Sequence, residues 1–418
     1  MPMKNAFYAQ SGGVTAVINA SACGVIETAR QHRDRIGTVF AGRHGIIGAL
    51  TEDLMDTGLA SAADIAALRH TPAGGFGSCR FKLAGLEDNR REYQRLMAVF
   101  QAHDIGYFFY NGGGDSADTC YKVSRLSADM GYPIQAIHIP KTIDNDLPIT
   151  DNCPGFGSVA KYIAVSTLEA SYDVRAMAQT STKVFVLEVM GRHAGWIAAA
   201  GGLVEDRGIP VVVLFPEVAF ARQRFLDAVQ AKVEAHGYCT VVVSEGARWP
   251  DGRFLAEQGG RDSFGHAQLG GAAPVVADII TTALGYKLHW AVADYLQRAA
   301  RHLAAATDVA QAYALGQAAV NMALRGDNAV MPTIVRTADT PYTWEIGSAP
   351  LSKVANVEKT LPRAWITDDG FGITQRCKDY LYPLIAGEAY PPYHDNGLPD
   401  YVTLQLPSVK QKLPKFTL

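Results

Sequence analysis

The segment IQAIHIPKTIDND, residues 134–146, joins a short apolar run to a cluster of polar side chains. Residues 134–139 have the length and composition of a buried strand. Residues 141–146 then bring a lysine, a threonine and two aspartates together. These groups can supply a counter-charge for phosphate, a general base and magnesium ligands. A solvated acidic turn is the alternative, but it explains neither the lysine nor the threonine.

Similar apolar runs recur along the chain, each followed by glycine or polar residues and then by a helix-like stretch. They cover residues 7–10, 105–110, 184–189, 211–215 and 240–243. This alternation predicts parallel strands with crossover helices, an α/β fold. Apolar residues at helical spacing predict helices over residues 15–31, 116–130 and 287–306.

Two glycine-rich segments follow predicted strands, where parallel sheets bind ligands. SGG at residues 11–13 suits a phosphate at a helix N-terminus, and it is also typical of a tight strand-to-helix turn. NGGGDS at residues 111–116 contains three consecutive glycines, which favour close approach of the backbone to a ligand. Its aspartate and serine also suit a helix cap.

Other segments carry weaker signals of the same kind. MGR at residues 190–192 places an arginine beside a glycine at a strand end, which suits bidentate phosphate recognition but also describes a surface arginine. GGFGSCR at 74–80 and SEG at 244–246 are individually unspecific. In FGH at 264–266 the histidine lies near several glycines and is a candidate ligand.

The composition indicates an ordinary globular protein. The 418 residues allow two or three domains, and 19% charged with 48% hydrophobic residues argue against disorder. The net charge of −3 supplies no basic field for nucleic acid. Without an 18-residue apolar run or a signal-peptide pattern, we expect no membrane contact and a cytoplasmic location. The six scattered cysteines suit free thiols in a reducing compartment.

Taken in order, SGG, GGGDS, PKTIDND, MGR, SEG and FGH resemble the phosphofructokinase family over roughly residues 4–285. The resemblance implies two doubly wound, mostly parallel-sheet α/β domains with the active site between them. It implies phosphoryl transfer to the 1-hydroxyl of fructose 6-phosphate, with Asp144 as the base, Gly12 giving its N–H to the donor phosphate and Arg80 bridging donor and acceptor.

The implied catalytic residues are Asp144, Asp115, Lys141 and Arg192. The implied donor-binding residues are Gly12, Gly13, Arg80, Gly113 and Gly114. The implied sugar-phosphate residues are Thr142, Ile143, Asp144, Met190, Gly191, Arg192, Glu245 and His266.

Two positions resemble the pyrophosphate-dependent branch of that family. Asp115 stands where ATP users have a glycine, and Lys141 replaces a glycine of the short bacterial ATP users. We therefore expect a reversible, Mg²⁺-requiring, glycolytic enzyme that uses pyrophosphate. An ATP-dependent enzyme of the same fold is one alternative. A non-catalytic, regulatory sugar-phosphate-binding subunit is another, against which the intact Asp144 argues.

Other positions depart from the family pattern. Gly114 stands where a magnesium-binding aspartate is usual, and the candidate metal ligands in this chain are Asp115 and Asp146. Lys183 replaces a 6-phosphate arginine, and the second such arginine has no clean equivalent. The resemblance therefore implies that Lys183, Tyr286 and Lys287 contact the 6-phosphate, some of them from a neighbouring subunit.

The domain boundaries follow from the motif order. We expect a donor-binding domain at residues 1–150, completed by helices from about 268–330, and a fructose 6-phosphate domain at 151–267. Residues 331–418 would form a C-terminal extension, whose interleaved prolines and tyrosines after residue 383 suggest an extended tail on the body or on a neighbouring subunit. The resemblance implies a homodimer or homotetramer.

Overall fold

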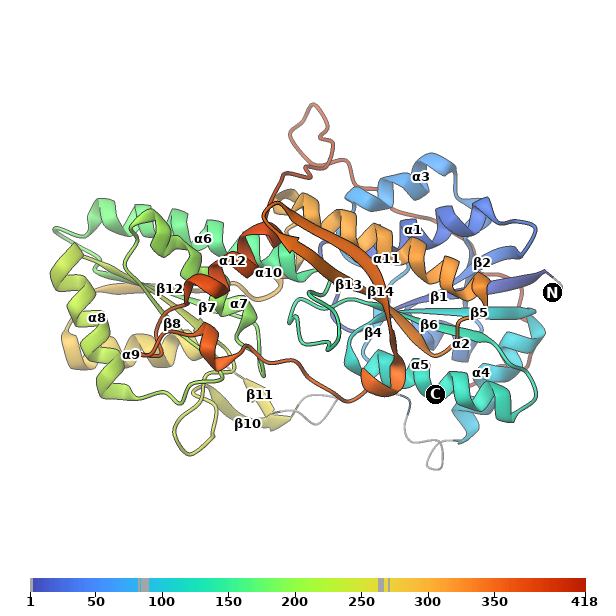
Figure 1. Ribbon diagram of the computed structural model, residues 1–418, viewed down its shortest axis with the longest axis horizontal. Coiled ribbons are helices and arrows are strands. Elements are labelled where there is room, and N and C mark those ends of the chain that lie inside the picture. Colours follow the sequence, from blue (N-terminus) through green and yellow to red (C-terminus); the bar gives the residue numbers. More distant parts are fainter. Residues whose placement is uncertain (1–2, 82, 84–89, 262–266, 270) are drawn as a thin grey trace. The chain divides into compact units, whose positions relative to one another are not determined.

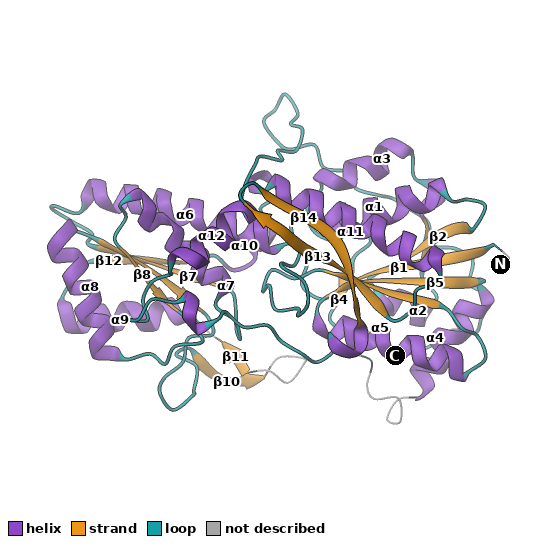
Figure 2. Cartoon of the chain, viewed as in Figure 1, coloured by secondary structure: helices purple, strands orange, loops and turns teal. Residues whose placement is uncertain are grey.

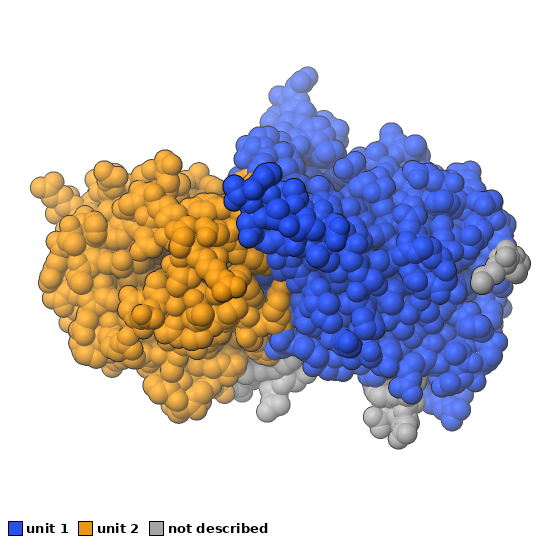
Figure 3. All heavy atoms as spheres, viewed as in Figure 1, with its two compact units in different colours: residues 1–155, 301–358, 387–418 blue, residues 156–300, 359–386 orange. Residues whose placement is uncertain are grey.

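The computed structural model describes residues 3–81, 83, 90–261, 267–269 and 271–418. The chain divides into two compact units, shown in blue and orange in Figure 3. The first consists of Met1–Gly155, Arg301–Glu358 and Gly387–Leu418, and the second of Phe156–Ala300 and Lys359–Ala386. The chain therefore passes between the units several times, and the stretch expected as a C-terminal extension is shared between them.

The first unit is built on a mostly parallel sheet with strand order β14-β13-β6-β5-β1-β2-β3, and β4 pairs with the end of β1 (Figure 1). Parallel pairing joins the consecutive strands β13, β6, β5, β1 and β2. At the two ends of the sheet, β14 pairs antiparallel with β13, and β3 pairs antiparallel with β2. The strand bounds are β1 Lys4–Ser11, β2 Ile36–Gly42, β3 Leu54–Asp56, β4 Ser78–Cys79, β5 Ile105–Gly112, β6 Gln135–Pro140, β13 Val330–Asp339 and β14 Tyr342–Pro350.

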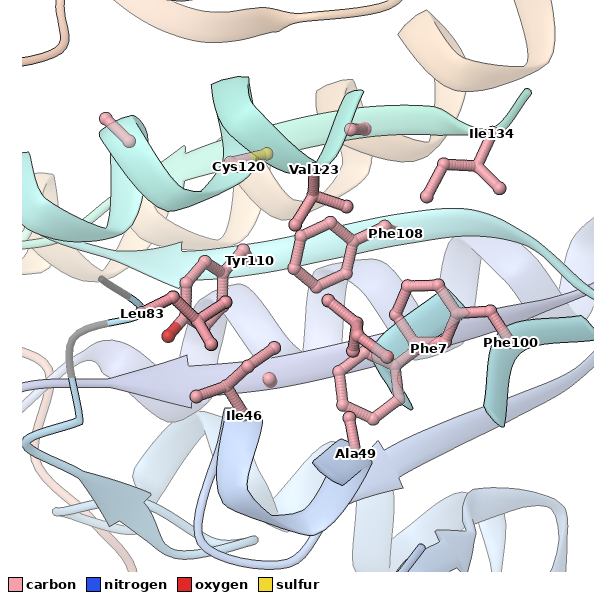
Figure 4. Packing of buried hydrophobic residues seen from close by; sticks show 14 of the residues in the cluster. Phe7, Ile46, Ala49, Leu83, Phe100, Phe108, Tyr110, Cys120, Val123 and Ile134 are labelled. Carbon is pink, nitrogen blue, oxygen red and sulfur yellow. The ribbon is translucent and has the colours of Figure 1, made fainter. Parts of the chain in front are cut away.

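Helices cover both faces of this sheet, which is why its central strands β1, β5 and β6 are buried along most of their length. The helix bounds are α1 Ile18–Gln31, α2 Ile46–Thr51, α3 Ala62–Ala67, α4 Arg90–Ala102, α5 Gly114–Asp129 and α11 Ala306–Arg325. Phe7 and Phe108 point to the face covered by α2, α4 and α5, where their rings pack 5.9 Å apart and against Phe100 (Figure 4). Tyr8 and Phe109 point to the face covered by α1 and α11.

The second unit is built on a parallel sheet with strand order β12-β7-β9-β8, and β10 and β11 form a separate antiparallel pair (Figure 2). The strand bounds are β7 Val184–Val189, β8 Val211–Leu214, β9 Cys239–Ser244, β10 Glu257–Arg261, β11 Ala267–Leu269 and β12 Leu288–Val292. The helix bounds are α6 Phe156–Met177, α7 Trp196–Gly201, α8 Arg222–His236, α9 Ala272–Leu284, α10 Asp294–Ala299 and α12 Gln375–Leu384. Valines from β7, β8 and β9 pack against α8 and α9.

The predicted α/β fold with parallel strands and crossover helices is confirmed. The helices predicted at 15–31 and 116–130 are present as α1 and α5. The helix predicted over 287–306 is wrong: residues 288–292 pair with β7 as the edge strand β12, and only the short helix α10 follows before Arg301.

Residues 402–413 of the C-terminal tail lie against the first unit. The Glu52 carboxylate accepts hydrogen bonds from the backbone N–H groups of Lys412 and Leu413 at 2.6 and 3.1 Å and pairs with His103 at 2.8 Å. Glu52 is buried and lies just after α2, so the tail closes over it. Within the described part of the chain, no helix is long and apolar enough to cross a membrane.

Candidate active site

The first functional element is the glycine turn that follows β1. Gly12 adopts φ +74°, a conformation that favours glycine. Its N–H donates to the Cys79 carbonyl at 2.9 Å, so in this structure that group is engaged within the chain. The side chain of Lys141 lies close to this turn, because a Cβ placed on Gly12 would lie 3.5 Å from Lys141 Nζ.

Lys141 fixes a positive charge at this turn. The residue is only 4% exposed, and its Nζ donates to the Gly13 carbonyl at 2.7 Å. Its backbone N–H donates to the Gly112 carbonyl at 3.0 Å, which ties the segment after β6 to the end of β5. A buried ammonium at this turn attracts an anion to the same place.

The second element is the glycine run at the N-terminus of α5. Ser116 Oγ donates to Ser11 Oγ at 2.8 Å, which joins the strand ends of β1 and β5. A Cβ on Gly112 would lie 2.1 Å from Ser116 Oγ, so Gly112 is required by packing. A Cβ on Gly114 would meet no atom within 4 Å, and Asp115 beside it is exposed. The N-terminus of this 16-residue helix thus presents backbone dipoles and open space.

The third element is the segment 141–146 that follows β6. Asp144 is held by Thr142, whose Oγ1 donates to Asp144 Oδ2 at 3.3 Å and accepts from the Asp144 N–H at 3.1 Å. Asn145 adopts φ +55° and accepts from the Cys153 N–H at 2.9 Å, which holds the loop in this strained form. The backbone of this loop therefore sets the direction of the aspartates on either side of Asn145.

Asp146 is the most perturbed carboxyl group of this loop. Burial, and then the charges of Asp144 and Glu358, raise its pKa to about 7. Its Oδ1 atom is buried and has no hydrogen-bond partner among the described residues. Such an oxygen suits a cation or a shared proton.

His138 is a buried residue of this site that sequence reasoning missed. It lies on β6, three residues before Lys141, and neither ring nitrogen has a hydrogen-bond partner within the described part of the chain. Burial, and then the charge of Lys141, lower its pKa to about 3. The imidazole is therefore neutral near pH 7. Its signal in the sequence was a lone polar residue in an apolar strand just ahead of a polar motif.

The first unit therefore brings most of the predicted donor and catalytic residues to one edge of its sheet. Arg80 is exposed and directly follows β4, which pairs with the end of β1, and Ser78 Oγ donates to the Gly12 carbonyl at 2.7 Å. The residues at this edge are Gly12, Gly13, Arg80, Gly113, Gly114, Asp115, Lys141, Thr142, Ile143, Asp144 and Asp146.

In the second unit, four of the predicted sugar-phosphate residues lie on the adjoining loops after β7 and β9. Gly191 adopts φ +117°, and its N–H donates to Glu245 Oε1 at 3.3 Å. Ser244 Oγ donates to the Gly191 carbonyl at 2.6 Å. A Cβ on Gly246 would lie 2.1 Å from the Arg192 carbonyl. The two loops are thus held together, with Met190, Gly191, Arg192 and Glu245 at the same sheet edge.

Lys183, Tyr286 and Lys287 lie at the opposite edge of that sheet. Lys183 precedes β7 and its N–H donates to the Lys287 carbonyl at 2.8 Å, while Lys287 Nζ donates to Ser181 Oγ at 3.0 Å. Because β7 has six residues, about 20 Å separate these cations from the loop that contains Arg192. The second unit taken by itself therefore does not bring these residues close to Arg192. His266 lies outside the described residues.

Comparisons with known proteins identify the family. The phosphofructokinase family profile matches residues 5–323. A protein of Methylococcus capsulatus named pyrophosphate–fructose 6-phosphate 1-phosphotransferase is 71% identical over 415 residues, covering 99% of both chains. One of the same name from Halomonas elongata is 65% identical over the full length of both. The chain belongs to the phosphofructokinase family.

A solved structure gives the same result for the fold of this phosphofructokinase. The crystal structure of the pyrophosphate-dependent phosphofructokinase of Nitrosospira multiformis has a TM-score of 0.92 and 66% identity, with 99% of this chain and 100% of that chain covered. The resemblance inferred from the motifs is confirmed.

Enzymes of the phosphofructokinase family generally need a divalent metal ion. Among the described residues no group of three or more histidine, cysteine, aspartate or glutamate side chains could hold one. Mg²⁺, however, is commonly held by one or two carboxylates together with substrate phosphates and water. The orphaned Oδ1 atom of Asp146 fits that form of site.

Proposed function

We propose that this chain transfers a phosphoryl group from pyrophosphate to the 1-hydroxyl of fructose 6-phosphate, giving fructose 1,6-bisphosphate and phosphate. Relatives at 71% and 65% identity are named for that reaction. The observation that carries the donor assignment is the buried Lys141 ammonium at the Gly12-Gly13 turn. We further propose that the enzyme is cytoplasmic and homo-oligomeric, as its sequence leads us to expect.

Asp144 acts as the general base on the sugar hydroxyl. The Thr142 hydroxyl orients its carboxylate, and the raised pKa of the neighbouring Asp146 reduces the repulsion between the two groups near neutral pH. Asp144 takes the proton of the 1-hydroxyl while the oxygen attacks the nearer phosphorus of pyrophosphate. The positive charge of Lys141 and the N-terminus of α5 stabilise the charge that collects on the departing phosphate.

The remaining charged residues position the two substrates. Arg80 follows the strand beside the Gly12 turn and contacts phosphate oxygens between donor and acceptor, while Arg192 and Glu245 hold the sugar phosphate. Asp146 would hold Mg²⁺ together with the substrate phosphates, and the ion neutralises phosphate charge when bound.

Asp115 disfavours ATP as the donor. If a nucleotide bound with its α-phosphate about 4 Å from this carboxylate, the repulsion would be about 4 kcal/mol at an effective dielectric constant of 20. That corresponds to roughly a thousandfold loss of affinity. Pyrophosphate has no third phosphate to place there.

The substitution Asp144→Asn tests the assignment of the base. Loss of a general base lowers kcat by about 10²–10⁴, while KM for fructose 6-phosphate should stay within about threefold because the amide keeps the shape of the side chain. Asp129→Asn, at an exposed position on α5, is the control and should leave kcat unchanged. Near-normal kcat in Asp144→Asn would refute the assignment.

A further inference from the structure

The loop that carries Arg192 is held at its far end by a carboxylate outside the sequence motifs. Glu217 lies just after β8, and its Oε1 atom accepts the Gly195 N–H at 2.9 Å. Gly195 lies three residues after Arg192 and caps α7. The near end of the loop is held separately, because Gly191 bonds to Glu245 and to Ser244. Arg192 therefore lies in a short loop whose two flanking glycines, Gly191 and Gly195, are both held by hydrogen bonds.

The same Glu217 oxygen also holds the C-terminal segment Lys359–Ala386. The Leu361 N–H donates to Oε1 at 3.0 Å. Trp196, directly after Gly195, donates from Nε1 to the Lys359 carbonyl at 3.1 Å. Its ring packs against Trp365 and Tyr380 with centroid distances of 5.7 and 5.3 Å. The loop and the C-terminal segment are thus connected by a shared acceptor, a direct hydrogen bond and an aromatic cluster.

The surroundings of Glu217 leave no room for a side chain at position 195. A Cβ on Gly195 would lie 2.6 Å from Glu217 Oε2 and 2.9 Å from the Phe215 ring. Oε2 is buried and has no hydrogen-bond partner among the described residues, and burial raises the pKa of this carboxyl group. Burial of a carboxylate is costly, and the two backbone N–H groups that donate to Oε1 offset part of that cost.

We propose that Glu217 is a positioning residue for Arg192, and that the segment Lys359–Ala386 is part of the same clamp. Glu217 does not touch the substrate: it fixes the C-terminal end of the loop through Gly195, and Leu361 and Trp196 fix it against the C-terminal segment. The proposal rests on the proposed function in one respect, namely that Arg192 binds fructose 6-phosphate. It assigns residues 359–386 a part in sugar-phosphate binding.

The test compares Glu217→Ala, Glu217→Gln and Trp196→Phe by steady-state kinetics with both substrates. Glu217→Ala should raise KM for fructose 6-phosphate by about tenfold or more, the effect of losing a charge-assisted hydrogen bond at the anchor. KM for pyrophosphate should stay within about twofold. Glu217→Gln keeps an acceptor oxygen and should restore KM to within about threefold of the wild type. Trp196→Phe keeps an aromatic ring but loses the Nε1 hydrogen bond to the Lys359 carbonyl. It should therefore raise KM for fructose 6-phosphate about threefold.

Controls separate this proposal from the proposed function. Glu234→Ala, at an exposed carboxylate on α8, should leave both constants unchanged. Arg192→Ala should raise KM for fructose 6-phosphate; if it does not, the assignment of Arg192 fails, and with it the reason for the clamp. If Arg192→Ala behaves as expected but Glu217→Ala and Trp196→Phe lower only the melting temperature, or raise both KM values equally, Glu217 is merely structural and the proposal is overturned. If Glu217→Ala does not fold, Trp196→Phe and Glu217→Gln decide on the same criteria.

Discussion

Replacement of Lys141 by methionine removes the charge at the proposed donor site with little change in side-chain length. Lys141 is 4% exposed, and its Nζ lies 2.7 Å from the Gly13 carbonyl and next to the Gly12 turn. A phosphate oxygen about 4 Å from this ammonium gains about 4 kcal/mol at an effective dielectric constant of 20. Loss of that attraction should lower kcat/KM for pyrophosphate by roughly 10³-fold.

The assay is the formation of fructose 1,6-bisphosphate at varied pyrophosphate and at varied fructose 6-phosphate. KM for fructose 6-phosphate should change by less than about threefold, since the Arg192 loop belongs to the second unit. Lys353→Met, at an exposed position of the first unit, is the matched control and should behave as the wild type. A folded Lys141→Met protein whose kcat/KM for pyrophosphate stays within about fivefold of the wild type would refute the reasoning.

Three further substitutions have expected outcomes. Asp115→Gly combined with Lys141→Gly should abolish pyrophosphate-dependent turnover and give little activity with ATP, because Gly114 supplies no metal carboxylate; retained pyrophosphate turnover would contradict this. The folded-state pKa of His138, about 3, lies below its unfolded value of about 6.5, so the unfolded state binds the proton more tightly. The free energy of unfolding of the wild type should therefore decrease by about 1.4 kcal/mol for each unit by which the pH falls between these two values. Urea midpoints of His138→Gln should depend less on pH over that range. Glu52→Ala should destabilise the fold by about 3–5 kcal/mol, since it strips a buried acceptor from the tail and from His103; a loss below about 1 kcal/mol in urea unfolding would contradict it.

The stability contributed by Glu52 should also depend on pH. Burial opposes its ionisation, but the N–H groups of Lys412 and Leu413 and the His103 ring together hold its folded-state pKa below the usual value. A depressed carboxyl pKa stabilises the fold above the unfolded pKa of about 4.3, and this stability is lost as the pH falls through the folded-state value. Glu52→Gln should therefore show a flatter acid limb than the wild type in urea unfolding.

The strands and the donor edge of the first unit were predictable because the signals are local. Each apolar run has the length of a buried strand, and the polar residues that follow it necessarily meet at one sheet edge. That argument alone placed Gly12, Asp115, Lys141 and Asp144 together, as the structure does.

Features that depend on distant partners were not predictable. Leu288 and Val292 repeat at helical spacing, yet hydrogen bonds to β7 make residues 288–292 a strand. Lys183 and Lys287 were assigned to the 6-phosphate from the family resemblance, which stays a prediction, and the distance of these residues from Arg192 along β7 follows only from the strand pairing. Glu217 belongs to no motif and acquires its contacts only when Gly195 and Leu361 meet it in the fold.

The division into units differs in detail from the expected domain boundaries. The chain leaves the first unit after Gly155 and re-enters it at Arg301, and it crosses again after Glu358 and after Ala386. The crossings after Gly155, before Arg301 and after Glu358 have no composition shift or linker, whereas the one after Ala386 lies where prolines and tyrosines begin to interleave. Boundaries near 150, 267 and 330 were therefore the best that motif order could give.

The central claim is that Lys141 and Asp115 select pyrophosphate as the phosphoryl donor. The most direct measurement supplies the purified wild-type protein with fructose 6-phosphate and Mg²⁺, and compares the initial rate of fructose 1,6-bisphosphate formation with pyrophosphate and with ATP at equal concentrations. The account predicts rapid turnover with pyrophosphate and little or none with ATP. A faster rate with ATP than with pyrophosphate would contradict it.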